Sequence, residues 1–279
     1  MSLDVGPPYC VYSKIYRNPK GVGAWLASEC RRLGVDIRLS STVTSVDLTS
    51  HNTIQSVQYE TDGNLKRVYC QSLVVAAGPW TPTMFHKLFP KSPISLKSAL
   101  NAGDWILFRN PFPLTKKSIA FIALDDIVDE KLEFTGRNDG TIWLIGRKDS
   151  NATLPPLGKV ASPNGAMINE LIDRAKRHLS FVDGEVGQNG ATLEIIDKGR
   201  AIRPATNSLL PIISSVKAED LSDDVGSSSD SSGVFVSCGH GSYGLTLGMG
   251  TGKILSQLVL GEETDIDISL FDITRDKKT

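Results

Sequence analysis

The chain has 279 residues, 40% hydrophobic and 22% charged, a composition typical of a globular protein with enough apolar material for a core. A net charge of -1 gives no electrostatic reason to expect nucleic acid or an anionic membrane surface as a partner. No apolar run reaches the roughly 18 residues of a membrane helix, and the N-terminus lacks a signal-peptide pattern, so we expect no membrane span and a cytoplasmic protein. The four cysteines lack metal-site spacing, which predicts free thiols and no metal site.

The first part of the chain predicts one helix followed by short strands. Residues 20–33 place apolar side chains at helical spacing, and Gly34 ends the pattern. Residues 35–39 alternate and are partly β-branched, which predicts a strand. Three further alternating runs between residues 42 and 72, separated by polar turns, predict a β-meander.

The middle of the chain changes character. Residues 73–78, LVVAAG, form a continuous apolar run that favours a buried parallel strand. Several alternating runs between residues 95 and 150 predict an antiparallel sheet. Residues 164–179 have the pattern of an amphipathic helix, and residues 192–203 that of a long strand.

The last part begins with an acidic, Ser-rich segment at residues 217–232, which predicts a solvated, flexible loop, with a phosphorylation-regulated contact as the alternative. Residues 234–238 form a second apolar strand. A Gly-rich turn and a helix follow over residues 239–261. Parallel and antiparallel parts therefore interleave, which predicts an α/β (interleaved α+β) fold with discontinuous domains.

The strongest chemical signal lies at residues 233–253, where an apolar strand enters a Gly-rich turn and then a helix. Gly239, Gly241 and Gly244 leave the backbone bare, so a flat ligand can approach it closely. The helix start would offer free N–H groups to an anionic edge, such as that of a reduced flavin. The alternative is a tight strand-to-helix turn with no ligand.

A second signal is the end of the first apolar strand, because open α/β sheets bind ligands at strand ends. Ala76, Ala77 and Gly78 would let a dinucleotide pass close by, and Trp80 could wall a flavin. Close packing of strand and helix is the alternative.

A third signal is Arg203, which precedes Pro204 at the end of the predicted long strand. An arginine there could hold a substrate carboxylate through two parallel hydrogen bonds. A structural arginine paired with an acidic residue remains an equal alternative.

These motifs occur in an order that resembles one superfamily of FAD-dependent oxidoreductases, which contains D-amino-acid oxidase, glycine oxidase and sarcosine oxidase. The sequence around AAGPWTP is most similar to that of uncharacterised fungal members. The resemblance covers residues 19–80 and 193–275 well, and it rests on four segments in order: GVGAWLASECRRLGVDIRLSSTVTSV, LVVAAGPW, GRAIRP and GVFVSCGHGSYGLTLGMGTGK.

The resemblance implies a partial Rossmann-like FAD-binding domain, at residues 19–90 and 193–275, and an antiparallel-sheet substrate domain at residues 91–192. It implies FAD as cofactor and a small-molecule amine or amino acid as substrate. Val43 would lie near the adenine half of FAD. The residues implied to line the rest of the cofactor are Ala76, Ala77, Gly78, Trp80, Gly239, His240, Gly241, Ser242, Gly244, Leu245 and Thr246. The implied catalytic residues are Arg203, which would hold a carboxylate, Tyr243, which would contact substrate, and His240, which would tune the flavin.

The sequence departs from the family in two places. The family's N-terminal GxGxxG turn, which binds the FAD pyrophosphate, is absent, so the first βαβ unit is expected upstream of Met1 in relatives, and the cofactor domain is expected to be incomplete. Thr206 and Tyr243 stand where some members carry an arginine and a lysine, which leaves the substrate class open.

Two functions therefore remain open from the sequence. The first is an FAD-dependent enzyme that oxidises a C–N bond by hydride transfer. The second is a non-catalytic remnant, or a trafficking or adaptor protein that reuses the fold.

Overall fold

The computed structural model describes residues 19–97, 99–110, 118–123, 131–146, 148–179, 194–222 and 231–274. The chain divides into two compact units. One comprises residues 1–45 and 57–68, and the other comprises residues 46–56 and 69–279.

The N-terminal region contains a helix and a three-stranded sheet. Helix α2 spans Pro19–Arg32, and Gly34 follows it with φ +83°, as predicted. The strands of the sheet lie in the order β1-β2-β3: β1 Ser41–Leu48, β2 Ile54–Thr61 and β3 Asn64–Tyr69. The predicted meander is confirmed. The strand predicted at residues 35–39 is wrong, because the segment is irregular. Its alternating apolar residues Val35 and Leu39 are 51% and 73% exposed, so the alternation does not form a buried face.

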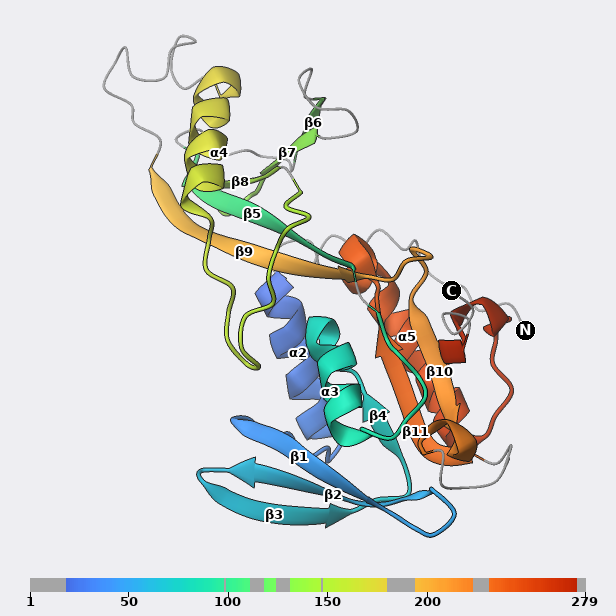
Figure 1. The fold of residues 1–279 in the computed structure, drawn as a ribbon. Coiled ribbons are helices and arrows are strands. Elements are labelled where there is room, and N and C mark those ends of the chain that lie inside the picture. Colours follow the sequence, from blue (N-terminus) through green and yellow to red (C-terminus); the bar gives the residue numbers. More distant parts are fainter. Residues whose placement is uncertain are drawn as a thin grey trace, which may run out of the picture. The chain divides into compact units, whose positions relative to one another are not determined.

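The second unit contains the predicted antiparallel sheet (Figure 1). Its five strands lie in the order β6-β7-β8-β5-β9. They are β5 Ala99–Arg109, β6 Ser118–Ala123, β7 Lys131–Gly136, β8 Thr141–Ile145 and β9 Ile195–Ala205. Strand β9 is the long strand expected from the sequence, and it pairs along β5 from Ala99↔Ala205 to Phe108↔Ile195.

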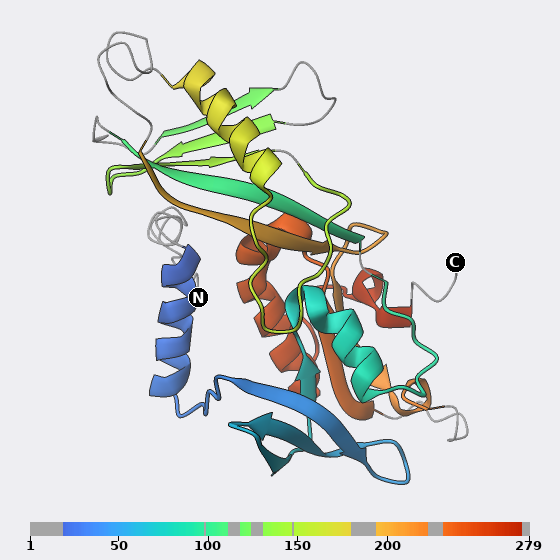
Figure 2. The ribbon, with the colours of Figure 1, turned by 60° about the vertical axis from the view of Figure 1, so that its left-hand side comes forward.

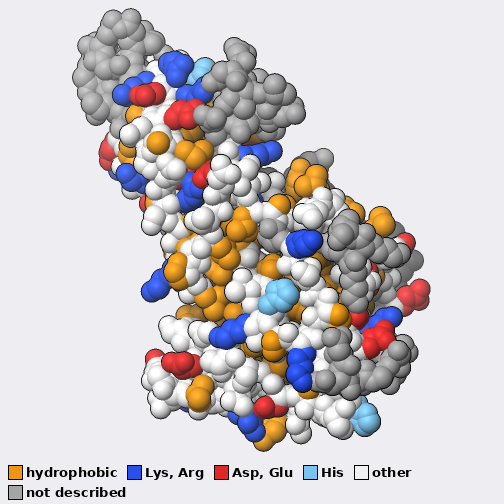
Figure 3. Space-filling model, viewed as in Figure 1, with side chains coloured by type: hydrophobic (Ala, Val, Ile, Leu, Met, Phe, Trp, Pro, Cys, Tyr) orange, Lys and Arg blue, Asp and Glu red, His pale blue; other side chains and the backbone are white. Residues whose placement is uncertain are grey.

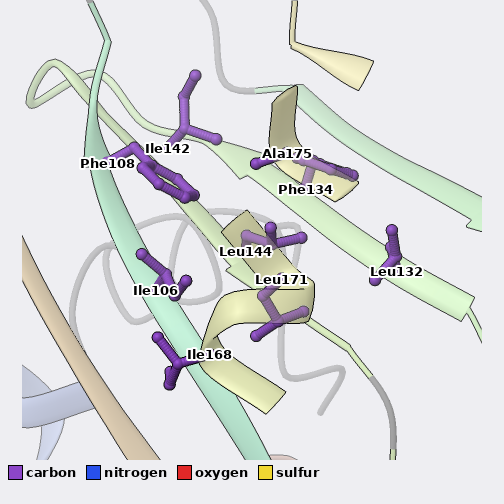
Figure 4. Close-up of a cluster of buried hydrophobic side chains, with 9 residues drawn as sticks. All are labelled: Ile106, Phe108, Leu132, Phe134, Ile142, Leu144, Ile168, Leu171 and Ala175. Carbon is purple, nitrogen blue, oxygen red and sulfur yellow. The ribbon is translucent and has the colours of Figure 1, made fainter. Parts of the chain in front are cut away.

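Helix α4 (Gly165–His178) covers one face of this sheet (Figures 1 and 2). The Asn164 side chain caps its start by accepting hydrogen bonds from the N–H groups of Ala166 and Met167. Apolar side chains of the helix point onto alternate residues of the strands (Figure 4). The buried cluster consists of Ile106, Phe108, Leu132, Phe134, Ile142, Leu144, Ile168, Leu171 and Ala175. A gap of about 10 Å³ beside Asp104 and Met167 has room for no more than a water molecule, so it is no cofactor site.

A shorter sheet carries the strand ends that the sequence singled out. Its order is β10-β11-β4, formed by β10 (Ile212–Lys217), β11 (Ser231–Cys238) and β4 (Leu73–Val75). Helices α3 (Thr81–Leu88) and α5 (Gly244–Leu260) lie on opposite faces of it (Figures 1 and 2). This cover explains why Val234 to Cys238 are all buried, although successive side chains point to opposite faces.

The acidic loop predicted at residues 217–232 is shorter in the structure. Lys217 ends β10, Ala218–Asp220 form a 3-10 turn, and β11 begins at Ser231, while residues 223–230 lie outside the described residues. Ala218 and Leu221 are buried, so the beginning of this polar segment packs against the protein. Both sheets belong to the same compact unit, and the division into cofactor and substrate domains stays a prediction.

Acidic and basic side chains are interspersed on the face shown in Figure 3, consistent with the net charge of -1. Within the ranges that the structure describes, no helix is both long enough and apolar enough to cross a bilayer.

Candidate functional site

The two apolar strands of the sequence analysis are parallel neighbours. Strands β4 and β11 pair in the register Leu73↔Val234 to Val75↔Val236. Parallel strands end at the same sheet edge, so the segments that follow them, residues 76–78 and 239–243, leave the sheet side by side. The structure therefore brings together the two motifs that the sequence could only propose separately.

The glycines at these strand ends differ in what surrounds them. Gly78 and Gly241 both have φ +57°, and a Cβ atom on either would meet nothing within 4 Å. Gly239, with φ +81°, is buried, and a Cβ there would come within 2.5 Å of the Thr206 Cγ2 atom. Gly239 is thus explained by internal packing, whereas Gly78 and Gly241 combine a left-handed backbone with open space.

Helix α5 begins beside these glycines with an open N-terminus. Its N-cap residue, Tyr243, makes no capping hydrogen bond through its side chain, and the first turn carries no acidic residue. Every residue from Ser242 to Gly250 is exposed. Free N–H groups and the positive end of the helix dipole are therefore available to an anionic group.

His240 connects the strand end to this helix. Its Nε2 atom lies 2.9 Å from the Thr251 hydroxyl oxygen, and burial lowers the pKa of the imidazole below its ordinary 6.5. The neutral ring is therefore favoured at neutral pH. Since Thr251 lies on α5, the contact ties the turn to the helix.

Trp80 and Tyr243 have contrasting surroundings. The Trp80 indole N–H donates a 2.9 Å hydrogen bond to the Pro155 carbonyl, which fixes the ring against the segment between β8 and α4. Tyr243 is 66% exposed. Its predicted contact with substrate stays a prediction.

Strand β9 ends at the same edge, where Ala205 forms a β-bridge with His240. Two residues earlier, the Arg203 Nη1 atom donates a 3.2 Å hydrogen bond to the Asn101 side-chain oxygen. The Arg203 guanidinium lies over Gly103, where a Cβ would come within 2.4 Å of it. The glycine on the neighbouring strand thus makes the room that this side chain occupies.

Arg200, three residues earlier, forms the ion pairs that the structural alternative expected of Arg203. Arg200 pairs with Asp104 at 2.5 Å and also with Asp149, and the Asp104 side chain is fully buried. The Asp104 carboxylate also accepts a 2.8 Å hydrogen bond from the Asn164 N–H at the start of α4. Within the described part of the chain, Arg203 forms no such ion pair. Arg200 is therefore a structural arginine, and the role of Arg203 as a carboxylate ligand stays a prediction.

Thr206 has a structural explanation. It is 1% exposed, its hydroxyl donates a 2.6 Å hydrogen bond to the Leu210 carbonyl, and its methyl group fills the space against Gly239. A long cationic side chain would not fit there.

The structure does not join every predicted residue into one site. Ala76, Ala77, Gly78, Trp80 and Arg203 belong to the same compact unit as the segment 239–246. Val43 lies on β1 in the other unit, so its predicted position near an adenine stays a prediction.

Sequence reasoning missed Asn101, Gly103 and Asp104. They surround the two arginines of β9, yet they lie about 100 residues before them in the chain. A strand pattern at residues 99–109 was visible, but only the pairing Asn101↔Arg203 and Asp104↔Arg200 shows what these residues do.

Comparison with solved structures shows that the fold is similar to those of a glycine oxidase and an L-amino acid deaminase. Glycine oxidase from Geobacillus kaustophilus aligns with a TM-score of 0.58 and 22% identity, over 87% of this chain and 54% of that one. L-amino acid deaminase from Proteus myxofaciens aligns with a TM-score of 0.64 and 16% identity, over 91% of this chain and 59% of that one. At these identities, the likeness establishes the fold alone.

The sequence comparison establishes the family. Residues 11–258 match the family described as FAD dependent oxidoreductase, so the chain belongs to it. An uncharacterised oxidoreductase of Schizosaccharomyces pombe is 29% identical over 204 residues, which cover 72% of this chain and 45% of that protein. The chain thus spans about half the length of the relatives it matches.

The residues of the second unit fit the flavin ring of FAD, the family's cofactor. The open, positive-φ glycines Gly78 and Gly241 leave space for a flat group, and the uncapped start of α5 offers donors to its anionic edge. No GxGxxG turn for the pyrophosphate precedes residue 239 in the sequence, and the pattern occurs as GHGSYG at residues 239–244, in the turn after β11.

Proposed function

We propose that this chain forms the substrate-facing part of an FAD-dependent enzyme that oxidises the C–N bond of an amine or amino acid. One observation carries the proposal: β4, β11 and β9 bring open glycines, an uncapped helix start and Arg203, an arginine without an ion pair in the described residues, to one sheet edge. Family membership supports the same conclusion.

The chain's own residues would bind and orient the reactants. Arg203 stays charged and would hold a substrate carboxylate with two parallel hydrogen bonds, which fixes the α-carbon in place. The N–H groups at the start of α5 would stabilise negative charge on the flavin's pyrimidine edge. Neutral His240 leaves that region without an added positive charge. FAD, when bound, supplies the hydride acceptor.

The test is to purify the chain with FAD in excess, remove free cofactor and record the visible spectrum. Protein-bound flavin bands at about 370 and 450 nm, bleached anaerobically by an amino acid, would support the proposal. The matched variant is Arg203→Met, which should keep the flavin bands and lose bleaching by amino acids while bleaching by dithionite persists.

A protein that binds no flavin under these conditions would contradict the proposal. That result would favour the other function left open by the sequence, a non-catalytic protein that reuses the fold.

A further inference from the structure

The face of the five-stranded sheet opposite α4, here called the Arg203 face, carries a second charged group. Leu132 and Phe134 of β7 point into the cluster under α4, so the residue between them, Glu133, points to the opposite face. The strand pairings place one residue of each strand in a single row across that face: Phe121, Glu133, Ile145, Trp105 and Gly199.

Arg203 and Glu133 lie on this face a defined distance apart. The Arg203 guanidinium lies over Gly103, which is two residues along β5 from the row that contains Glu133. Glu133 is two strands away, since β8 separates β7 from β5. Strand spacing and rise then put the Cα atoms of Gly103 and Glu133 about 12 Å apart.

Glu133 retains capacity to accept further hydrogen bonds. In the described ranges, its carboxylate accepts one hydrogen bond, 3.2 Å from the Thr135 hydroxyl, and forms no ion pair. The nearby Arg137 guanidinium instead lies over the Trp143 ring, 5.6 Å from its centroid. Burial lowers the pKa of Arg203, and the negative charges of Asp104 and Glu133 act in the opposite direction. Glu133 is therefore close enough to interact electrostatically with Arg203.

The residues between the two charges on this face are apolar or glycine. The Trp105 indole leans over Gly199 on β9, where a Cβ would come within 2.5 Å of it. The ring therefore points towards β9, whereas the space over Gly103 holds the Arg203 guanidinium. Half-buried Ile145 offers an aliphatic floor, and Trp105 offers a wall on one side.

We propose that the substrate is an amino acid with a cationic side chain, whose carboxylate binds Arg203 and whose distal cation binds Glu133. This inference rests on the proposed function and deepens it. An extended diamino acid with one hydrogen bond at each end is comparable in length to the Gly103–Glu133 Cα separation, and its methylene chain would lie on Ile145. Glu133 is then a specificity residue that does not take part in the redox step.

The test uses the FAD-loaded chain kept reduced with dithionite, so that binding is measured without turnover. Calorimetry under argon would compare racemic lysine with racemic norleucine, which has a similar shape and no distal charge. We expect lysine to bind about tenfold more tightly, because a charge-assisted hydrogen bond to a partly buried carboxylate discriminates by at least that factor.

Three variants make the result specific. Glu133→Gln should reduce the lysine preference to about one, and Glu133→Lys should shift the preference towards racemic 2-aminoadipate. Glu170→Gln, on α4 and so on the opposite side of the sheet, should keep the lysine preference.

The outcomes separate the two proposals. If lysine and norleucine bind equally well to the flavin-loaded wild type, or if Glu133→Gln keeps the preference, the assignment of Glu133 is overturned while the proposed function stands. If the chain takes up no flavin and binds neither amino acid, both proposals fall.

Discussion

Two regions of the second unit differ in how far their apolar side chains are exposed. Under α4, the nine residues of the cluster are at most 8% exposed, so the five-stranded sheet and its helix form a closed core. At the start of α5, four large apolar residues are 43–66% exposed: Tyr243, Leu245, Leu247 and Met249. Both regions are apolar, but only the side chains of the first are buried by packing within the described part of the chain.

The difference shows where stability and ligand binding reside. Large apolar side chains left exposed are candidates for an interaction surface, and here they follow the open glycine Gly241 in the sequence. The closed sheet would serve as the rigid support that holds Arg203, and the open helix start as the surface for a cofactor.

The largest effect is expected in the closed core. Leu144→Ala should lower the free energy of unfolding by about 4 kcal/mol, because it removes a fully buried side chain and leaves a cavity. Leu247→Ala on α5 should change it by less than about 0.5 kcal/mol. Urea titrations of the two variants would measure both values, and equal losses would contradict the contrast between the regions.

The next effect concerns the ion pairs of Arg200. Arg200→Met should cost about 3 kcal/mol of unfolding free energy, because it leaves the buried Asp104 carboxylate without its cation. The control is Arg109→Met, whose partner Glu194 is well exposed and whose loss should leave the free energy of unfolding nearly unchanged. Similar urea unfolding midpoints for the two variants would contradict a structural role for Arg200.

A smaller and more specific effect is expected at the glycine-rich turn. Gly241→Ala should weaken FAD binding about tenfold, because it strains a positive-φ residue and fills the space beside the strand ends. Gly140→Ala in the β7–β8 turn also has positive φ and open space, so it should cost similar stability and leave FAD affinity unchanged. Fluorescence titration with FAD would compare them, and a matching loss in both variants would show that strain alone is responsible.

The smallest effect is a pH dependence from His240. Its pKa is lowered in the folded protein, so its contribution is complete above pH 6.5 and is lost as the pH falls below 6.5 through the lowered value. Wild-type stability, measured by urea unfolding from pH 8 to pH 5, should therefore fall more steeply towards pH 5 than that of His240→Asn. Parallel profiles would mean that the imidazole is not held neutral by burial.

Much of this arrangement could be predicted from the sequence. Continuous apolar runs gave β4 and β11 correctly, and Gly34 and Gly261 marked the ends of α2 and α5, where each has positive φ. The resemblance to the family predicted from the sequence that Arg203 and the Gly-rich turn belong to one site.

Other features depend on distant contacts that no local pattern encodes. The alternation at residues 35–39 has no buried face to pack against, whereas α3 is only two turns long and was missed although Pro82 at its start is a helix signal. Arg200 and Arg203 look equivalent in sequence. Their odd separation on β9 sends them to opposite faces of the sheet, and only the pairing with β5 shows which one is already bound to carboxylates.

The most direct measurement is hydrogen–deuterium exchange of the chain with and without saturating FAD. We expect slower exchange of the backbone amides at residues 76–78 and 241–246 when FAD is present, with no change in α4. Protection confined to other segments, or none at all at saturating cofactor, would contradict the assignment of these strand ends and this helix start to the flavin.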